Sequence, residues 1–266
     1  MSKNLGFIGC GNMGKAMIGG IVNSKLYDPN NVMVSDPSDS SLKEVQEKYG
    51  IKTTTDNLQV VNFADIIILS VKPNIIMSVI EKIKDFIKPS TVIISIAAGQ
   101  KLEKLSVSFK NEVKLVRVMP NTPALVNEGM SAISINENVC DEELEEVVKI
   151  FNSFGKAEVI DEKLMDAVTA VSGSSPAYVY MFIEAMADGA VLQGMPRDKA
   201  YKFAAQAVLG SAKMVLETGK HPGKLKDEVS SPGGTTIEAV YSLEKNNFRG
   251  TVIEAINVCT DKSKNM

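Results

Sequence analysis

Three glycines near the start of the chain have the types and spacing to bind a phosphate group. They form the pattern Gly9-x-Gly11-x-x-Gly14, after a short apolar run and before a helix expected at residues 15–22. The first glycine of such a turn allows a sharp bend, the second lets phosphate oxygens approach the backbone, and the third lets the helix pack closely on the strand. The free N–H groups of that helix would then bind a pyrophosphate. The pattern, together with the alternating elements after it, favours a dinucleotide-binding turn over a plain glycine-rich turn.

Asp36 follows the second expected strand, at residues 32–35, and lies 22 residues after Gly14. An acidic residue at this distance accepts a hydrogen bond from the adenosine ribose of a bound dinucleotide. A carboxylate there would repel a 2′-phosphate, and the nearest cation along the chain is Lys43. The sequence therefore leans toward NADH over NADPH. The Asp-Pro pair is equally typical of a simple turn, and that interpretation stays open.

Helices and strands alternate over the first part of the chain, which predicts a parallel sheet with helices on both faces. The expected strands at residues 65–71, 91–96 and 114–118 each run into a small loop rich in proline or glycine. Ligands bind at the carboxyl ends of such strands. The further cofactor-binding candidates at this edge are Cys10, Asn12, Met13, Ser35, Asn57, Ser70, Val71, Lys72, Pro73, Ala97 and Asn121. Each polar member taken alone is as typical of a cap or turn.

The pattern changes to helices only after residue 161, which predicts a dinucleotide-binding domain at residues 1–161 and a helical domain at residues 162–266. A helix expected at residues 196–217 is rich in alanine and glycine. Small residues let helices approach closely, and a segment of about 100 residues has little room for a wide core. We therefore expect burial against a second subunit.

A second cluster of chemically useful residues lies at residues 230–236, where two serines, a Pro-Gly-Gly turn and two threonines precede a helix. Successive N–H groups and hydroxyls at a helix start suit an anion such as a carboxylate. Routine helix capping is the alternative. The substrate-binding candidates are Ser231, Gly233, Gly234, Thr235 and Thr236.

Composition excludes several other classes of function. The net charge of −3 and the absence of a basic patch argue against nucleic acid and anionic membranes as partners. The three cysteines are widely spaced, which fits a reducing cytoplasm and predicts neither a disulfide framework nor a zinc site. We expect no signal peptide, because the first expected strand begins within a few residues of Met1. The only histidine, His221, stands before Pro-Gly and is expected to be exposed or to cap a turn. A Ser-His-Asp triad and a histidine metal centre are therefore not expected.

The sequence resembles the pyrroline-5-carboxylate reductase family over nearly its whole length. The matching segments are FIGCGNMG at residues 7–14, SVKP at 70–73, VMPNTPA at 118–124, SGSSPAYV at 172–179, HPGKLKD at 221–227 and SSPGGTT at 230–236. Two positions depart from the family pattern: Ser175, where glycine is usual, and Asp36, where many members carry a neutral residue. The second departure makes use of NADP less certain than in the family.

The resemblance implies an α/β fold with an N-terminal Rossmann-type domain and a C-terminal all-helical dimerisation domain. It also implies hydride transfer from NAD(P)H to the C=N bond of 1-pyrroline-5-carboxylate, giving L-proline. Thr236 would be catalytic, bonding the ring nitrogen, while the loop at residues 231–236 holds the substrate carboxylate and Asn57 and Lys72 lie near the cofactor. The family forms homodimers, often in a larger ring such as a decamer, with one chain's cofactor meeting the partner's loop.

Two other functions compete with this one. A 3-hydroxyacid dehydrogenase would carry a catalytic lysine on the first helix of its second domain, and no lysine follows Ser172-Gly173 at the required spacing. A non-catalytic dinucleotide-binding paralogue, a sensor or competence-type protein, would keep the glycine turn but lose the hydroxyl-rich loop, which is intact here.

Overall fold

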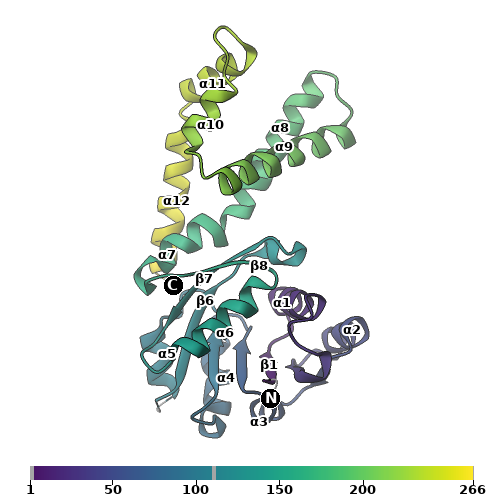
Figure 1. Cartoon of the computed structure of the whole chain (residues 1–266), viewed down its shortest axis with the longest axis vertical. Helices are drawn as coiled ribbons and strands as arrows, with labels where there is room; N and C mark the ends of the chain where they lie inside the picture. The colour runs from purple at the N-terminus through teal and green to yellow at the C-terminus, as the bar shows by residue number, and fades with distance from the viewer. Residues whose placement is uncertain (1–2, 110–111, 266) are drawn as a thin grey trace. The chain divides into compact units, whose positions relative to one another are not determined.

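The structure is a computed structural model that describes residues 3–109 and 112–265. It divides into two compact units (Figure 1). The first unit contains the described residues up to Ser174 together with those from Cys259 onward, and the second contains Ser175–Val258. Each unit is described by itself.

An eight-stranded sheet runs through the described residues of the first unit in the order β3-β2-β1-β4-β5-β6-β7-β8. The six strands from β3 to β6 are parallel, β7 is antiparallel to β6, and β8 is parallel to β7. The strands are β1 Leu5–Ile8, β2 Val32–Ser35, β3 Lys52–Thr54, β4 Ile66–Leu69, β5 Val92–Ser95, β6 Lys114–Met119, β7 Gly129–Ile135 and β8 Gly155–Val159. The chain order reverses at β1, and ligands of such sheets bind at the carboxyl ends of the strands beside this point.

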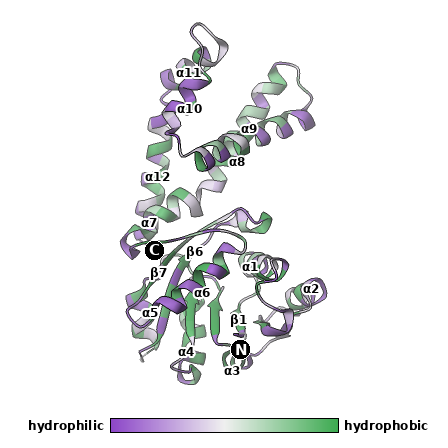
Figure 2. Ribbon diagram, viewed as in Figure 1, coloured by the Kyte–Doolittle hydropathy of each residue, from purple (hydrophilic) through white to green (hydrophobic). Residues whose placement is uncertain are grey.

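Helices cover both faces of this sheet, because the central strands are apolar on both sides (Figure 2). In β4, Ile68 packs into the hydrophobic cluster on one face and Ile67 into the cluster on the other. The first cluster includes residues of α1 (Asn12–Asn23), α2 (Asp39–Tyr49) and α6 (Asp141–Asn152). The second includes residues of α3 (Asn57–Phe63), α4 (Ile76–Ile83) and α5 (Leu102–Phe109). The sequence prediction of a parallel sheet between two helical layers is confirmed.

Short turns complete the first unit. The 3-10 turns are η1 Pro29–Asn31, η2 Lys84–Phe86, η3 Thr122–Val126 and η4 Glu162–Leu164, followed by α7 Met165–Val168 and a π turn at Thr169–Gly173. The end of α12 (Phe248–Lys264) returns to this unit, where Ser263 Oγ donates a 2.7 Å hydrogen bond to Asp166 Oδ1.

The second unit consists of helices. These are α8 Ser175–Leu192, α9 Arg197–Thr218, α10 Pro222–Glu228, α11 Thr235–Lys245 and the first part of α12. Its buried apolar residues, among those the structure describes, are three alanines, Ala187, Ala200 and Ala204. Large apolar side chains such as Phe203, 66% exposed, and Leu216, 82% exposed, lie on its surface. The second unit therefore has no hydrophobic core of its own. None of the helices within residues 3–109 and 112–265 has the length and apolarity needed to span a membrane.

One strand and one helix were not expected from the sequence. Strand β3 pairs with β2 at the sheet edge. Helix α10 begins at Pro222, directly after His221. In addition, the first helix starts at Asn12, three residues earlier than expected, so that Gly14 lies in its first turn.

Candidate functional site

The glycine turn begins at Gly9, which connects β1 to the two neighbouring strands. Its φ of +108° lies in the left-handed region, and a Cβ built on it would lie 2.5 Å from Ser70 O. Gly9 N donates to Ser35 O at 2.8 Å, and Ser70 Oγ donates to Gly9 O at 2.7 Å. The bend therefore requires glycine, and the ends of β2 and β4 hold it in place.

Gly11 and Gly14 are the other two glycines of the pattern. Gly14 packs so closely that an added Cβ would lie 2.6 Å from Gly9 O. Gly11 is the N-cap of α1, and an added Cβ there meets nothing within 4 Å. No side chain caps the helix, so its first N–H groups have no acceptor within it. Open space in front of uncapped N–H groups fits the pyrophosphate of a dinucleotide.

Asp36 lies at the end of β2 and bonds directly to the glycine turn. Its Oδ2 accepts a 2.7 Å hydrogen bond from Cys10 N, and its Oδ1 accepts one of 2.8 Å from Ser38 N. The turn interpretation of Asp36 is thus confirmed, while its contact with a ribose stays a prediction. Burial, followed by the Asp36 charge, raises the pKa of the Cys10 thiol to about 11. Cys10 is therefore a small, neutral packing residue at neutral pH.

Lys15 is a charged residue of this site that the sequence analysis missed. It lies in the first turns of α1, and its Nζ forms an ion pair with Glu44 of α2. The hydrogen bond that Lys15 donates to Glu44 raises the pKa of Lys15, and the charge of Asp36 contributes in the same direction. Lys15 is therefore a cation of this site, whereas the sequence analysis considered only Lys43. The signal available in the sequence was a lysine directly after Gly14.

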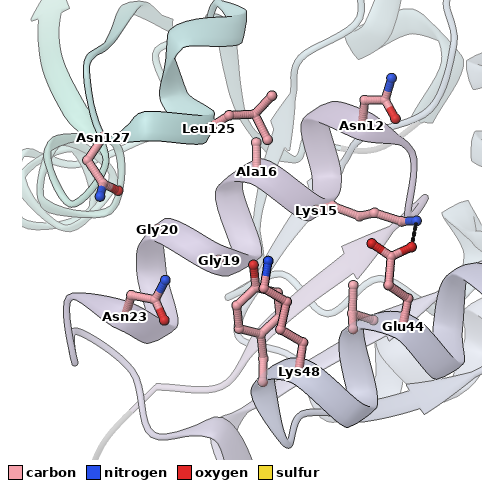
Figure 3. A pocket seen from close by; sticks show the side chains of 12 residues that line it. Asn12, Lys15, Ala16, Gly19, Gly20, Asn23, Glu44, Lys48, Leu125 and Asn127 are labelled. Carbon is pink, nitrogen blue, oxygen red and sulfur yellow. Dashed lines mark hydrogen bonds and ion pairs between the residues drawn. The ribbon is translucent and has the colours of Figure 1, made fainter.

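A cavity of about 560 Å³ lies beside α1 (Figure 3). Lys15 and Glu44 point toward each other across one part of it, and Leu125 and Asn127 come from the η3 segment. Its lining residues are Asn12, Lys15, Ala16, Gly19, Gly20, Asn23, Glu44, Val45, Lys48, Tyr49, Leu125 and Asn127. The cavity thus extends from the start of α1, next to the glycine turn, along the α1–α2 boundary.

Buried Ser35 and half-buried Asn57 form a hydrogen-bonded pair. Ser35 is fully buried and its Oγ donates a 2.7 Å hydrogen bond to Asn57 Oδ1. Ser35 therefore positions Asn57 from inside the sheet. Among the residues after β4, Val71 and Pro73 are half-buried and Lys72 is exposed. Their cofactor contacts stay predictions.

Ala97 and Asn121 follow β5 and β6, and both are buried. The Asn121 side chain is already used within the protein, because its Nδ2 donates to Ser172 O at 3.1 Å and its Oδ1 accepts from Met130 N at 2.8 Å. Asn121 therefore fixes the loop after β6. A cofactor contact at either residue stays a prediction.

The hydroxyl-rich loop belongs to the second unit and leads into α11. Gly233 has a φ of +68°, and Gly234 N donates to Ser231 O at 3.0 Å. A Cβ on Gly234 would lie 2.4 Å from Ser231 Oγ. Gly234 is the N-cap of α11 and makes no side-chain capping bond, which leaves the N–H groups of Thr235 and Thr236 without an intrahelical acceptor. This geometry suits a carboxylate.

His221 caps α10 through Nδ1, which accepts a 3.1 Å hydrogen bond from Gly223 N. The expected capping role is confirmed. The cap leaves this histidine with a structural function.

The strand order, the glycine turn and the uncapped start of α1 define a dinucleotide-binding protein of the Rossmann type with a helical second unit. A family model described as pyrroline-5-carboxylate reductase dimerisation matches residues 162–266. A model described as NADP oxidoreductase, coenzyme F420-dependent, matches residues 4–99.

Full-length relatives agree with these two matches. Pyrroline-5-carboxylate reductase from Escherichia coli (strain K12) is 52% identical over 100% of this chain and 99% of its own. The enzyme of the same name from Methanosarcina acetivorans is 44% identical over 100% and 98%. The crystal structure of Plasmodium falciparum pyrroline carboxylate reductase with NADP bound superposes with a TM-score of 0.89, at 38% identity over 99% and 97% of the two chains. The chain belongs to the pyrroline-5-carboxylate reductase family, which sets aside the 3-hydroxyacid dehydrogenase alternative.

Proposed function

We propose that this chain reduces the C=N bond of 1-pyrroline-5-carboxylate with NAD(P)H and forms L-proline. The observation that carries the proposal is the 52% identity to a named reductase along the whole chain. The helix starts without a side-chain cap at the glycine turn and at the hydroxyl-rich loop support the proposal.

The first unit would bind the cofactor. The N–H groups at the start of α1 hold the pyrophosphate over Gly11, and Asp36 faces the adenosine end. Asn57, positioned by Ser35 at 2.7 Å, and Lys72 lie toward the cofactor as the family resemblance implies. When bound, the reduced nicotinamide supplies the hydride.

The second unit would bind the substrate. The uncapped N–H groups of Thr235 and Thr236, with Ser231, Gly233 and Gly234, orient the carboxylate. Thr236 would hydrogen-bond the ring nitrogen. Because a cyclic imine can enter already protonated, no histidine base is required, and the protein contributes mainly positioning and electrostatics.

The helical part, residues 162–266, would also form a homodimer. A unit whose buried apolar residues are three alanines needs a partner to cover its surface, and the match to a dimerisation model supports this. We further propose a ring of such dimers, such as a decamer, in which one chain's cofactor meets the partner's loop. The three free cysteines fit a cytoplasmic location.

Steady-state oxidation of NADH and NADPH with 1-pyrroline-5-carboxylate tests this function. The Thr236→Ala variant should lose at least about tenfold in kcat/KM, because a hydrogen bond to a charged group is removed. The matched control is Thr251→Ala, whose hydroxyl donates to Asn247 O, one residue before the start of α12. Dinucleotide binding without turnover would refute the reductase and support the non-catalytic paralogue. Equal losses in both variants would remove Thr236 from the reaction.

A further inference from the structure

Three charged side chains surround the point where the glycine turn meets α2. Asp36 is held by Cys10 N at 2.7 Å and Ser38 N at 2.8 Å, so its carboxylate has a fixed position. Lys15 extends from α1 to form an ion pair with Glu44 on α2 (Figure 3). This arrangement puts one cation and two carboxylates beside the expected adenosine end of the cofactor.

Cys10 contacts both Asp36 and the first turn of α2, the helix that carries Glu44. Its N–H binds Asp36, and its Sγ lies 3.6 Å from Ser41 O in the first turn of α2. Burial and the charges of Asp36 and Glu44 raise the pKa of its thiol, whereas the charge of Lys15 lowers it. An acid at the end of β2 is expected to meet the adenosine ribose in this fold, so we expect Lys15 and Glu44 to lie beside the ribose 2′ position.

We propose that the Lys15–Glu44 pair sets the choice between NADH and NADPH, with Lys15 as the group that binds a 2′-phosphate. In this chain Glu44 neutralises Lys15, and together with Asp36 it biases the site toward NADH. The inference rests on the proposed function, because it assumes that the glycine turn binds a nicotinamide dinucleotide.

The chemistry of the two cofactors explains the bias. NADH presents a 2′-hydroxyl, which can donate to Asp36 and needs no cation. NADPH presents a phosphate carrying nearly two negative charges, which Asp36 and Glu44 repel. The phosphate gains attraction only when Lys15 leaves Glu44. The ion pair can open, because the Glu44 side chain is 59% exposed and pairs of this kind are weak.

Binding of adenine nucleotide fragments tests the proposal without any turnover. The probes are 2′,5′-ADP, which carries a 2′-phosphate, and 5′-AMP, which has a 2′-hydroxyl instead. Calorimetry measures their binding, and the same measurement is then made with NADPH and NADH. Glu44→Gln should lower the Kd of 2′,5′-ADP and of NADPH by about fivefold, because it frees the Lys15 ammonium for a charge-assisted hydrogen bond to the 2′-phosphate. It should leave 5′-AMP and NADH within about twofold. Lys15→Gln should weaken the binding of only the two ligands that carry a 2′-phosphate, 2′,5′-ADP and NADPH. In the double variant it should abolish the gain caused by Glu44→Gln.

The matched control is Glu47→Gln, which removes an exposed carboxylate from the same helix. An equal gain in this control would overturn the proposal, since bulk charge would then be the cause. Persistence of the Glu44→Gln gain without Lys15, or equal changes for both probes, would also overturn it. A chain that shows the expected selectivity yet fails to reduce the imine would refute only the proposed function.

Discussion

Replacing Gly11 with alanine separates cofactor binding from folding. The Gly11 backbone, at φ −75° and ψ −174°, is extended and open to any residue, and an added Cβ meets no atom within 4 Å. We therefore expect Gly11→Ala to fold normally and to bind dinucleotide poorly.

The two effects can be estimated separately. Alanine is a poorer N-cap than glycine, which costs less than about 1 kcal/mol of stability. Alanine also makes the unfolded chain less flexible than glycine does, and this stabilises the folded state by about 0.4–1 kcal/mol. The free energy of unfolding should therefore change by no more than about 0.5 kcal/mol. The new methyl group occupies the space in front of the helix N–H groups, so at least one charge-assisted hydrogen bond to phosphate is lost. That loss is about 1.5–3 kcal/mol, or about tenfold to more than a hundredfold in Kd.

Denaturant unfolding and titration with NADH, followed by nicotinamide fluorescence, measure both quantities. Gly9→Ala is the contrasting variant, because its φ is +108° and its Cβ would clash with Ser70 O. It should lose at least about 2 kcal/mol of stability. If Gly11→Ala were as unstable as Gly9→Ala, or if it kept Kd within about twofold of the wild type, the assignment of Gly11 to phosphate approach would be wrong.

Two further predictions concern stability. Glu162→Ala should lower the free energy of unfolding by about 3 kcal/mol, because it leaves the buried Arg117 guanidinium without its 2.9 Å partner. Adding Arg117→Met should recover part of that loss in denaturant unfolding, and no recovery would argue against a buried charge as the cause. The raised pKa of Cys10 makes its contribution to stability complete below the ordinary thiol pKa of 9.0 and lost as pH rises toward about 11. The melting temperature of the wild type should therefore fall more steeply than that of Cys10→Ala between these pH values, and parallel curves would contradict this.

Local chemistry explains what the sequence predicted well. The apolar run of β4 and the glycine turn depend mainly on residues close to them in the sequence. Their composition and spacing were therefore sufficient to predict the strand and the turn. The bend assigned to Gly9 and the close helix packing assigned to Gly14 agree with their contacts, while phosphate approach at Gly11 stays a prediction. The lone histidine, expected to cap a turn, caps α10.

The missed features depend on tertiary pairing or are too short to show a period. Strand β3 has three residues and is defined by its pairing with β2, in register from Met33 with Lys52. Helix α10 has seven residues, and only the proline at its first position signals it. Lys15 and Glu44 are 29 residues apart, and their contact depends on how α1 packs beside α2. The hydrogen bond between Ser35 and Asn57 likewise depends on the fold.

The alanine-only interior of the second unit has a consequence for the protein at low concentration. Helices that bury so little apolar surface cannot offset the entropy lost when they are ordered. Their folding must draw on the surface covered by a second copy, so association and folding become one equilibrium. The midpoint of thermal unfolding then rises with protein concentration. On dilution, the first unit can keep its sheet while the helices lose their order, because its hydrophobic clusters are complete within one chain.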